Sequence, residues 1–269
     1  QILNNLTQHG AGIIGLDIVF SEADKTSPKL FAKKFGLDSK NLPDYDSILS
    51  QSVANTPTIL GYQFDFDHNN TKDAPQIPAI FIEKHKQSRD FLPLAHGVLT
   101  NLSIIQNASY SSGYMNNIPD ETGIIRSVPL MIKYNDMLYP SLAFEMFRIA
   151  TNTKKVIVNY SPAGAGNVLL GKELIHTDRF GKLHINFSCW GCLSPLGSSS
   201  ELMVGSEAPT IPCRSPYMPE VLVITRSISF SLFCQILCME RFSVSRSPCI
   251  LVKAVIIFST LFLNSLPER

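Results

Sequence analysis

The order of apolar and polar positions over the first 66 residues predicts helices that alternate with strands. Residues 2–9 carry apolar side chains at helical spacing, and residues 12–20 form a mostly apolar run rich in Ile and Val. Such a run is typical of a strand buried on both faces, so we expect a central, parallel strand there. Residues 28–36 and 44–55 predict two more helices, and residues 56–66 predict a second strand.

The pattern changes in the middle of the chain to short strands joined by turns. Residues 124–134 and 137–140 predict two strands around the turn Tyr-Asn-Asp, and an amphipathic helix follows over residues 141–152. Residues 154–187 predict a meander of short strands, whereas residues 80–105 give no clear pattern. The predicted fold class is α/β, with a mixed central sheet, flanking helices, antiparallel hairpin additions and an irregular C-terminal tail.

Composition divides the chain near Phe187. All six cysteines lie after this residue, and all twelve aspartates lie before it. We therefore predict a domain over residues 1–187 and an atypical Cys- and Ser-rich tail over residues 188–269. The chain also begins without Met or a leader pattern, which indicates an internal fragment of a longer protein.

The tail contains two apolar blocks, residues 221–239 and residues 249–263. A helix needs about 20 largely apolar residues to span a bilayer. Arg226 interrupts the first block, and the second is short and contains Lys253. Each block is therefore a poor membrane-spanning candidate, and weak membrane association of the tail is an expectation.

Charge and motif spacing exclude several function classes. A net charge of +1 gives no electrostatic footprint for nucleic acid. The spacing G-x4-G-K at Gly166, Gly171 and Lys172 continues into Glu173, whose charge would repel phosphate, so we predict a hairpin turn. The pair Cys189 and Cys192 lies among turn-forming residues, and we interpret it as incidental. No cofactor is expected.

Three acids follow the first predicted strand closely. Asp17 lies within the apolar run, and Glu22 and Asp24 lie in the polar segment after it. Ligands of α/β proteins bind outside the carboxyl ends of strands, so these acids are candidate ligand contacts. A Mg²⁺ or Ca²⁺ site is one alternative. The other is that Asp17 caps backbone groups or pairs with a basic residue such as Arg126.

The segments that carry these acids resemble a known family. GAGIIGLDIVFSEADKTSP resembles the start of the CHASE domain of type 2, and ILGYQF resembles its second strand. GYMNNIPDETGIIRSVPLMI, LYPSLAFEMFRIA and TDRFGKLHINF resemble later segments in the same order. The resemblance covers residues 1 to about 187.

This resemblance implies an extracytoplasmic sensor of a bacterial transmembrane receptor, without catalysis of its own. The parent would lie in the inner membrane, held by flanking transmembrane helices with this domain on the periplasmic side. Its cytoplasmic output would be a nucleotide cyclase such as adenylate cyclase, a histidine kinase or a Ser/Thr kinase. The partner would be a small molecule or an envelope ligand, and a homodimer is compatible with this reading. The candidate ligand contacts are Asp17, Glu22, Asp24 and Arg126.

Two features near Phe187 leave other interpretations open. The strand that follows INF in the family is absent, and the composition changes at the same place, so we hypothesise a frameshift near Phe187. The alternative is a diverged but genuine tail. A soluble metal-dependent α/β enzyme using Asp17, Glu22 and Asp24 remains the second functional hypothesis, and a non-signalling periplasmic interaction domain is the third.

Overall fold

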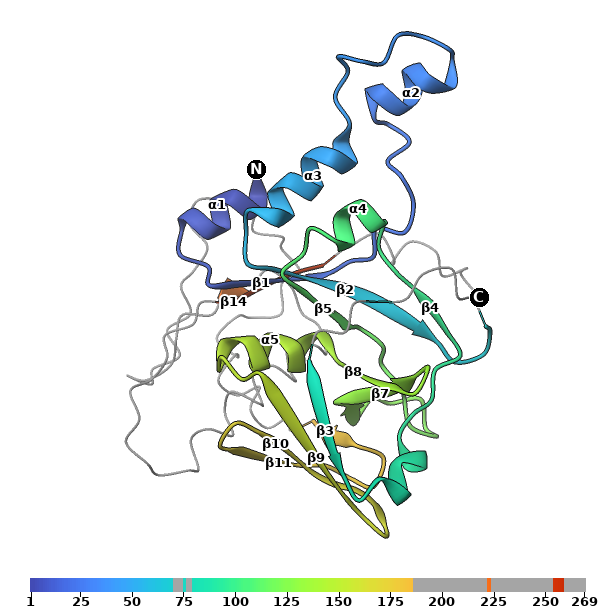
Figure 1. The fold of residues 1–269 in the computed structure, drawn as a ribbon, viewed down its shortest axis with the longest axis vertical. Helices are drawn as coiled ribbons and strands as arrows, with labels where there is room; N and C mark the ends of the chain where they lie inside the picture. The colour runs from blue at the N-terminus through green and yellow to red at the C-terminus, as the bar shows by residue number, and fades with distance from the viewer. Residues whose placement is uncertain (70–74, 76–78, 186–221, 224–253, 259–269) are drawn as a thin grey trace.

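The computed structural model describes residues 1–69, 75, 79–185, 222–223 and 254–258. Their arrangement is in layers (Figure 1): helices, a mainly parallel sheet, one helix, and a second sheet. This confirms the α/β prediction with a mixed sheet and added hairpins.

The main sheet is built around strand β1 (Ile13–Asp17). Its strand order is β13-β14-β1-β2-β4, and β5 also pairs with β2. Strand β1 is parallel to both of its neighbours, β2 and β14. The other strands of this sheet are β2 (Thr58–Asp65), β4 (Gly97–Leu99), β5 (Ser111–Tyr114), β13 (Leu222–Val223) and β14 (Ala254–Phe258).

Helices cover both faces of this sheet. One face packs against α1 (Ile2–Gln8), α3 (Tyr45–Ala54) and α4 (Ser103–Gln106), as Figure 1 shows. Leu16 of β1 and Val53 of α3 belong to the apolar cluster in this layer. Burial of such apolar area is the main force that holds helices on a sheet.

The opposite face of the sheet packs against α5 (Leu142–Ala150). This helix begins at the N-cap Ser141, whose hydroxyl accepts a hydrogen bond from Phe144 N (3.3 Å). A Cβ on Gly113 of β5 would lie 2.6 Å from the Leu142 Cα. Only glycine permits this approach of strand and helix, which fixes α5 against the sheet.

A second sheet lies on the far side of α5, with the order β11-β10-β9-β3. Its strands are β3 (Ile80–Lys84), β9 (Lys155–Ser161), β10 (Gly164–Leu170) and β11 (Glu173–His176). The remaining elements are η1 (Lys86–Phe91), the pair β6 (Ser127–Pro129) and β12 (Lys182–His184), and the hairpin β7 (Met131–Tyr134) and β8 (Met137–Pro140).

Several turns lie where the sequence predicts them. Asn135 and Asp136 have positive φ angles between β7 and β8, which suits a tight hairpin. Gly171 has φ of 63° between β10 and β11, so the G-x4-G-K spacing forms a hairpin, as expected, and no phosphate loop.

One helix projects from the body of the molecule. Helix α2 (Pro28–Lys34) lies at the tip of an arm that we define as residues 22–44 (Figure 1). Ser27 and Pro28 begin it as the sequence predicts, although the Ser27 hydroxyl bonds across the base of the arm. It donates to Pro43 O (3.3 Å) and accepts from Tyr45 N (3.2 Å).

Two stretches of the tail are strands. Residues 222–223 and 254–258 fall within or at the edge of the two apolar blocks, and β14 occupies the place next to β1. The proposed domain boundary and the frameshift near Phe187 stay predictions. No helix within the described residues is long and apolar enough to cross a bilayer.

Candidate ligand-binding site

The structure places Asp17 at the last position of β1. The sequence placed Asp17 inside a longer strand that continued to Phe20, and this was wrong. The strand ends early because the Asn101 side chain lies between β2 and the segment that follows β1. Asn101 Nδ2 donates to Gly61 O of β2 (2.8 Å), and its Oδ1 accepts from Phe20 N (2.8 Å). Asp17 therefore lies at the carboxyl edge of a parallel sheet, where α/β proteins bind ligands.

The described residues supply no partner for the Asp17 carboxyl group. It is partly buried, and within the described residues it makes no hydrogen bond or ion pair. Burial raises the pKa of Asp17 from 3.8 to about 6, because the charged carboxylate loses hydration. A partly buried acid without a partner costs stability, which makes Asp17 a candidate for a ligand contact.

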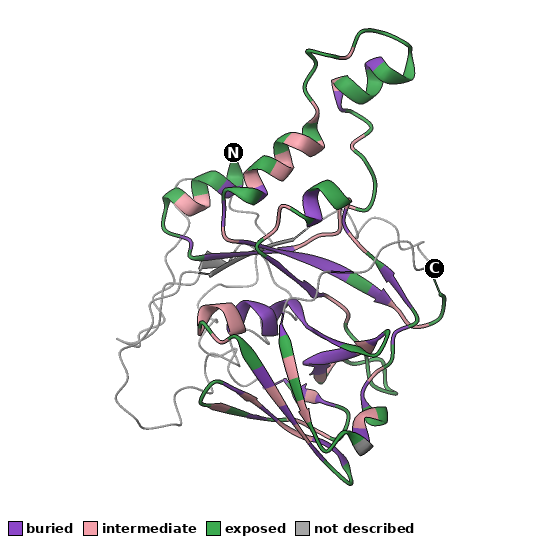
Figure 2. Cartoon of the chain, viewed as in Figure 1, coloured by how far each residue is buried: buried purple, intermediate pink, exposed green. Residues whose placement is uncertain are grey.

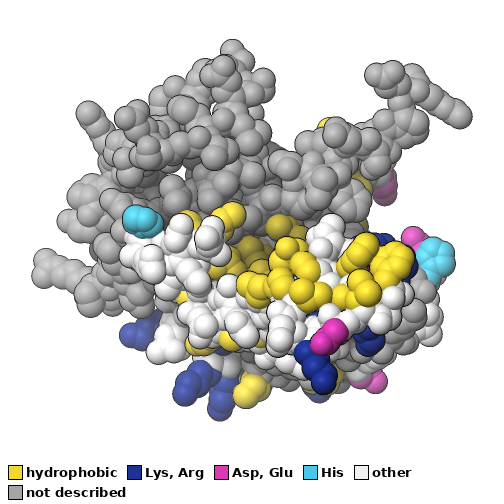
Figure 3. Space-filling view, turned by 90° about the horizontal axis from the view of Figure 1, so that it is seen from above, with side chains coloured by type: hydrophobic (Ala, Val, Ile, Leu, Met, Phe, Trp, Pro, Cys, Tyr) yellow, Lys and Arg dark blue, Asp and Glu magenta, His cyan; other side chains and the backbone are white. Residues whose placement is uncertain are grey.

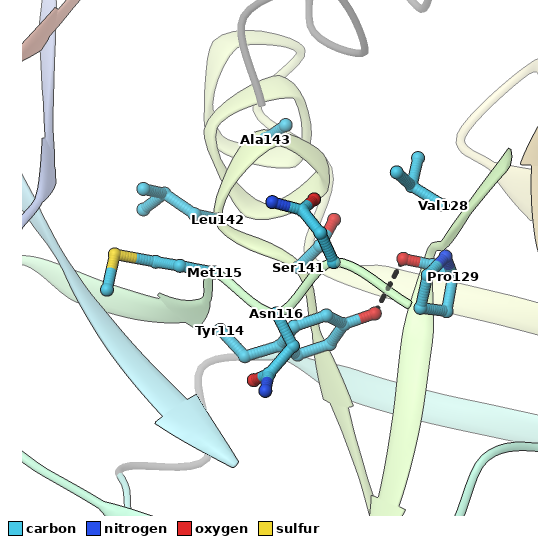
Figure 4. Close-up of a pocket in the computed structure, with 9 residues that line it drawn as sticks. Tyr114, Met115, Asn116, Val128, Pro129, Ser141, Leu142 and Ala143 are labelled. Carbon is cyan, nitrogen blue, oxygen red and sulfur yellow. Dashed lines mark hydrogen bonds between the residues drawn. The ribbon is translucent and has the colours of Figure 1, made fainter. Parts of the chain in front are cut away.

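A small hollow lies on the same face of the sheet, at the carboxyl end of β5 (Figure 4). It is shallow, and the volume that a water-sized molecule can reach inside it is about 10 Å³. Strand β6 and the first turn of α5 form the other walls. The lining residues are Tyr114, Met115, Asn116, Asn117, Val128, Pro129, Ser141, Leu142 and Ala143.

Met115 connects this hollow with the end of β1. A Cβ on Gly61 would lie 2.1 Å from Met115 Sδ and 2.7 Å from Leu16 O, so the thioether lies over Gly61 and next to β1. Side chains alternate along a strand, so Asp17 projects to the same side as Ile13. Ile13 packs in the apolar cluster that contains α5. Asp17 and the hollow thus share one face and one edge of the sheet.

The polar groups of the hollow differ in how they are used. Asn116 is structural, because its side chain exchanges two hydrogen bonds with the backbone of Phe64 (2.7 and 2.8 Å). The Tyr114 hydroxyl donates to Pro129 O (2.6 Å). Asn117 is exposed and makes no hydrogen bond within the described residues. In the first turn of α5, the N–H groups of Phe144 and Glu145 are already bonded to Ser141.

Glu22 and Asp24 do not converge on Asp17. Glu22 accepts a hydrogen bond from Lys25 Nζ (2.9 Å), which lowers the pKa of the Glu22 carboxyl. Asp24 Oδ1 accepts from the hydroxyl (2.7 Å) and the backbone N–H (2.8 Å) of Thr26, and the hydroxyl bond lowers its pKa most. Both acids organise the start of the arm.

Arg126 belongs to another network, so the expectation that it pairs with Asp17 was wrong. Arg126 Nη1 donates to Asp120 and to Thr122 Oγ1 (2.9 Å) in the turn that precedes β6. The Thr122 hydroxyl, followed by Ile124 N and Arg126, lowers the pKa of Asp120 to about 2. This network stiffens the loop that enters the hollow at Val128.

The described residues do not form a metal-binding cluster. Over the part of the chain that the structure describes, no three His, Cys, Asp or Glu side chains gather as a metal ion would require. The cysteines of the predicted C-x2-C pair, Cys189 and Cys192, lie outside the described residues.

Sequence reasoning missed several residues of this edge. Asn101 lies in a segment without a clear period, and nothing in its pattern signals a role. Asn116 and Asn117 do carry a signal, since two neighbouring amides follow Met115 just after the end of β5. Asp17 carries a similar signal, a polar side chain at the end of a strand. Treating amides as candidate ligand contacts together with acids would have found Asn116 and Asn117.

Comparison with known proteins gives one match. The family model of the CHASE2 domain matches residues 1–204, which is more than half of the chain. No curated protein was found to match the chain, and no solved structure was found to match it.

Proposed function

The chain belongs to the CHASE2 family of extracellular sensor domains, and from this premise we propose that it is the ligand-sensing module of a bacterial transmembrane receptor. The family assignment confirms the resemblance drawn from five sequence segments. Domains of this family are not themselves catalytic and are typically extracytoplasmic. We place the parent receptor in the inner membrane, with this domain on the periplasmic side.

The proposal also covers the output domain of the receptor. It is a nucleotide cyclase, a histidine kinase or a Ser/Thr kinase on the cytoplasmic side. The ligand is a small molecule or an envelope component, and its recognition starts at Asp17.

The observation that carries the proposed site is the Asp17 carboxyl at the carboxyl edge of β1, for which the described residues supply no partner. Its pKa of about 6 leaves it mostly ionised at neutral pH, so it favours a ligand that carries a positive charge or a hydrogen-bond donor. Asn117, which lines the hollow, offers a further polar group on the same side. Glu22, Asp24 and Arg126 stay proposed ligand contacts, although in this structure they bond to Lys25, Thr26 and Asp120.

Sensing works by a shift between conformations. A ligand that binds one conformation better than the other changes their populations by its difference in affinity. Movement at this edge changes how α5 packs on the sheet, because Met115, Leu142 and Ala143 line the same hollow.

The test is a thermal-shift assay on the whole chain with ethanolamine, spermidine and Mg²⁺ as separate probes. A cationic organic probe should raise the melting temperature by a few degrees, roughly as expected at concentrations well above its Kd. Asp17→Asn should remove the rise, whereas Asp67→Asn, which changes an exposed acid, should keep it.

Equal rises in the wild type and in Asp17→Asn would contradict the proposed site. A rise with Mg²⁺ alone, lost in Asp17→Asn, would instead favour the metal-enzyme hypothesis.

A further inference from the structure

The arm of residues 22–44 presents apolar side chains to solvent. Five large ones are exposed, and we call them the arm patch: Leu30, Phe31, Phe35, Leu37 and Leu42. Phe31, Phe35 and Leu37 are 55–61% exposed. Ala32 is the one residue of α2 that is buried, and Figure 2 shows the helix mostly in the exposed colour. The arm is therefore built with its apolar residues outward.

The arm patch is a formed surface. The rings of Phe31 and Phe35 contact each other, with centroids 4.6 Å apart. The base of the arm is closed by Lys29 N, which donates to Pro43 O (3.1 Å), and by the two hydrogen bonds of the Ser27 hydroxyl. These bonds hold α2 away from the sheet, at the outer end of the molecule (Figure 1). Exposed apolar clusters of this kind mark interaction sites.

Lysines surround the arm patch. Lys33, Lys34 and Lys40 form no ion pair within the described residues, whereas Lys25 and Lys29 pair with Glu22 (2.9 Å) and Asp44 (3.6 Å). Asp38 is the acid at the tip, and its Oδ1 accepts from Lys40 N (3.0 Å). Seen from above, hydrophobic side chains gather beside Lys and Arg side chains on this end of the molecule (Figure 3).

We propose that the arm patch docks on a lipid bilayer that contains anionic headgroups. Phe and Leu side chains next to a Lys-rich rim are the features that place a short amphipathic helix in the bilayer interface. The aromatic rings enter the boundary between headgroups and acyl chains, and Lys33 and Lys34 contact the phosphates. The proposal does not depend on the ligand or on the site at Asp17.

The charge pattern favours a bilayer over a second copy of the chain. Two arm patches placed face to face would bring Lys33, Lys34 and their counterparts together, with Asp38 and its counterpart as the acids at the tips, so cations would outnumber acids there. Five side chains at a tip also fall short of the roughly 20–30 residues per side that a stable dimer interface uses. A bilayer needs neither shape complementarity nor a large area.

The experiment is vesicle flotation with the whole chain. Vesicles of phosphatidylcholine and phosphatidylglycerol in equal amounts should carry the protein, and vesicles of phosphatidylcholine alone should not. Phe31→Ser with Phe35→Ser should weaken binding to the mixed vesicles by at least about tenfold. Lys33→Glu with Lys34→Glu should weaken it by a similar factor, because each Lys near an anionic surface contributes to binding.

Matched controls lie far from the arm. Phe180→Ser changes one partly exposed Phe, and Lys154→Glu with Lys172→Glu makes the same charge change at two exposed positions. Both should bind as the wild type does. Phe31→Trp gives a second measurement, since its fluorescence should shift to shorter wavelength on mixed vesicles.

Either of two results overturns the proposal. One is that the wild type does not float with the mixed vesicles, or that the arm variants bind as well as the controls. The other is that the wild type sediments as a dimer and Phe31→Ser with Phe35→Ser sediments as a monomer, which would assign the arm patch to self-association.

Discussion

Two acids on neighbouring elements, Glu145 on α5 and Asp17 on β1, have different surroundings. Glu145 of α5 is fully buried and satisfied: it accepts from Ser111 Oγ (2.5 Å) and from Arg148 Nη2 (2.6 Å) and Nε (2.7 Å). Asp17 of β1 is partly buried and has no bond within the described residues. Arg148 is held in turn by Thr153 O (2.5 Å). Glu145 thus joins α5 to β5, whereas Asp17 contributes nothing of this kind to the fold.

The difference separates structure from function. Each substitution replaces one carboxyl group by an amide. The free energy of unfolding should fall for Glu145→Gln and rise for Asp17→Asn. A group whose removal stabilises the fold is the better candidate for a ligand contact.

The largest expected effect is that of Glu145→Gln. The substitution removes the carboxylate charge that pairs with the largely buried Arg148, and breaking such a pair costs about 3 kcal/mol. Urea unfolding should show this loss at pH 7.5. Glu121→Gln, at an exposed position in a turn, should lie close to the wild type. A loss below about 1 kcal/mol for Glu145→Gln would mean that the ion pair between Glu145 and Arg148 contributes little to the fold.

Asp17→Asn should stabilise the chain, by about 1–2 kcal/mol at pH 7.5. Its folded pKa of about 6 exceeds the ordinary 3.8, so the folded state binds the proton more tightly than the unfolded state does. The stability from protonation is full below pH 3.8 and is lost as the pH rises through about 6. Urea unfolding from about pH 4 to 7.5 should show the advantage of Asn shrinking toward zero at the acid end.

Asp67→Asn is the control for this pH profile, because its exposed acid should give no comparable trend. A destabilised Asp17→Asn at neutral pH would indicate that Asp17 has a structural partner, and it would remove the contrast with Glu145.

The smallest effect should come from Arg126→Gln. Arg126 is an exposed member of a turn network, and surface ion pairs contribute about 0–1 kcal/mol. The pKa of Asp120 should stay well below its ordinary value, because the Thr122 hydroxyl is the largest cause of its shift. An NMR titration of the Asp120 carboxyl checks this. An Asp120 that returns to 3.8 would give Arg126 the main role in the loop.

The sequence predicts the helix and strand order well where amphipathic or apolar periods are long. The helix that starts at Ser141 and the strand that starts the sheet both follow from such periods, and the structure confirms them. Strand β3 was not assigned, since it is a five-residue strand with alternating exposure that pairs with β9, far along the chain. Short strands whose partners are distant give little local signal.

The candidate site was predicted only in part. Asp17 stands out in the sequence because an acid interrupts an apolar run. Its lack of a partner depends on Asn101, which ends β1 through contacts across the sheet, and on Arg126 being engaged by Asp120. The Asn101 contacts join residues far apart in the sequence, and the Arg126–Asp120 pair depends on the shape of a turn. The pattern of apolar positions carries information about neither. Glu145 had a signal of its own, a single acid within the apolar segment AFEMF.

The parallel pairing of β1 with β14 also has a consequence for synthesis on the ribosome. Ile13 of β1 pairs with Ala254, so its partner strand is made some 240 residues later. At about 5–20 residues per second, this edge of β1 waits roughly ten to fifty seconds for its neighbour. During that interval an apolar strand edge is open to mispairing with other chains. Nascent chains of this protein should therefore depend on holding chaperones until the last strand emerges.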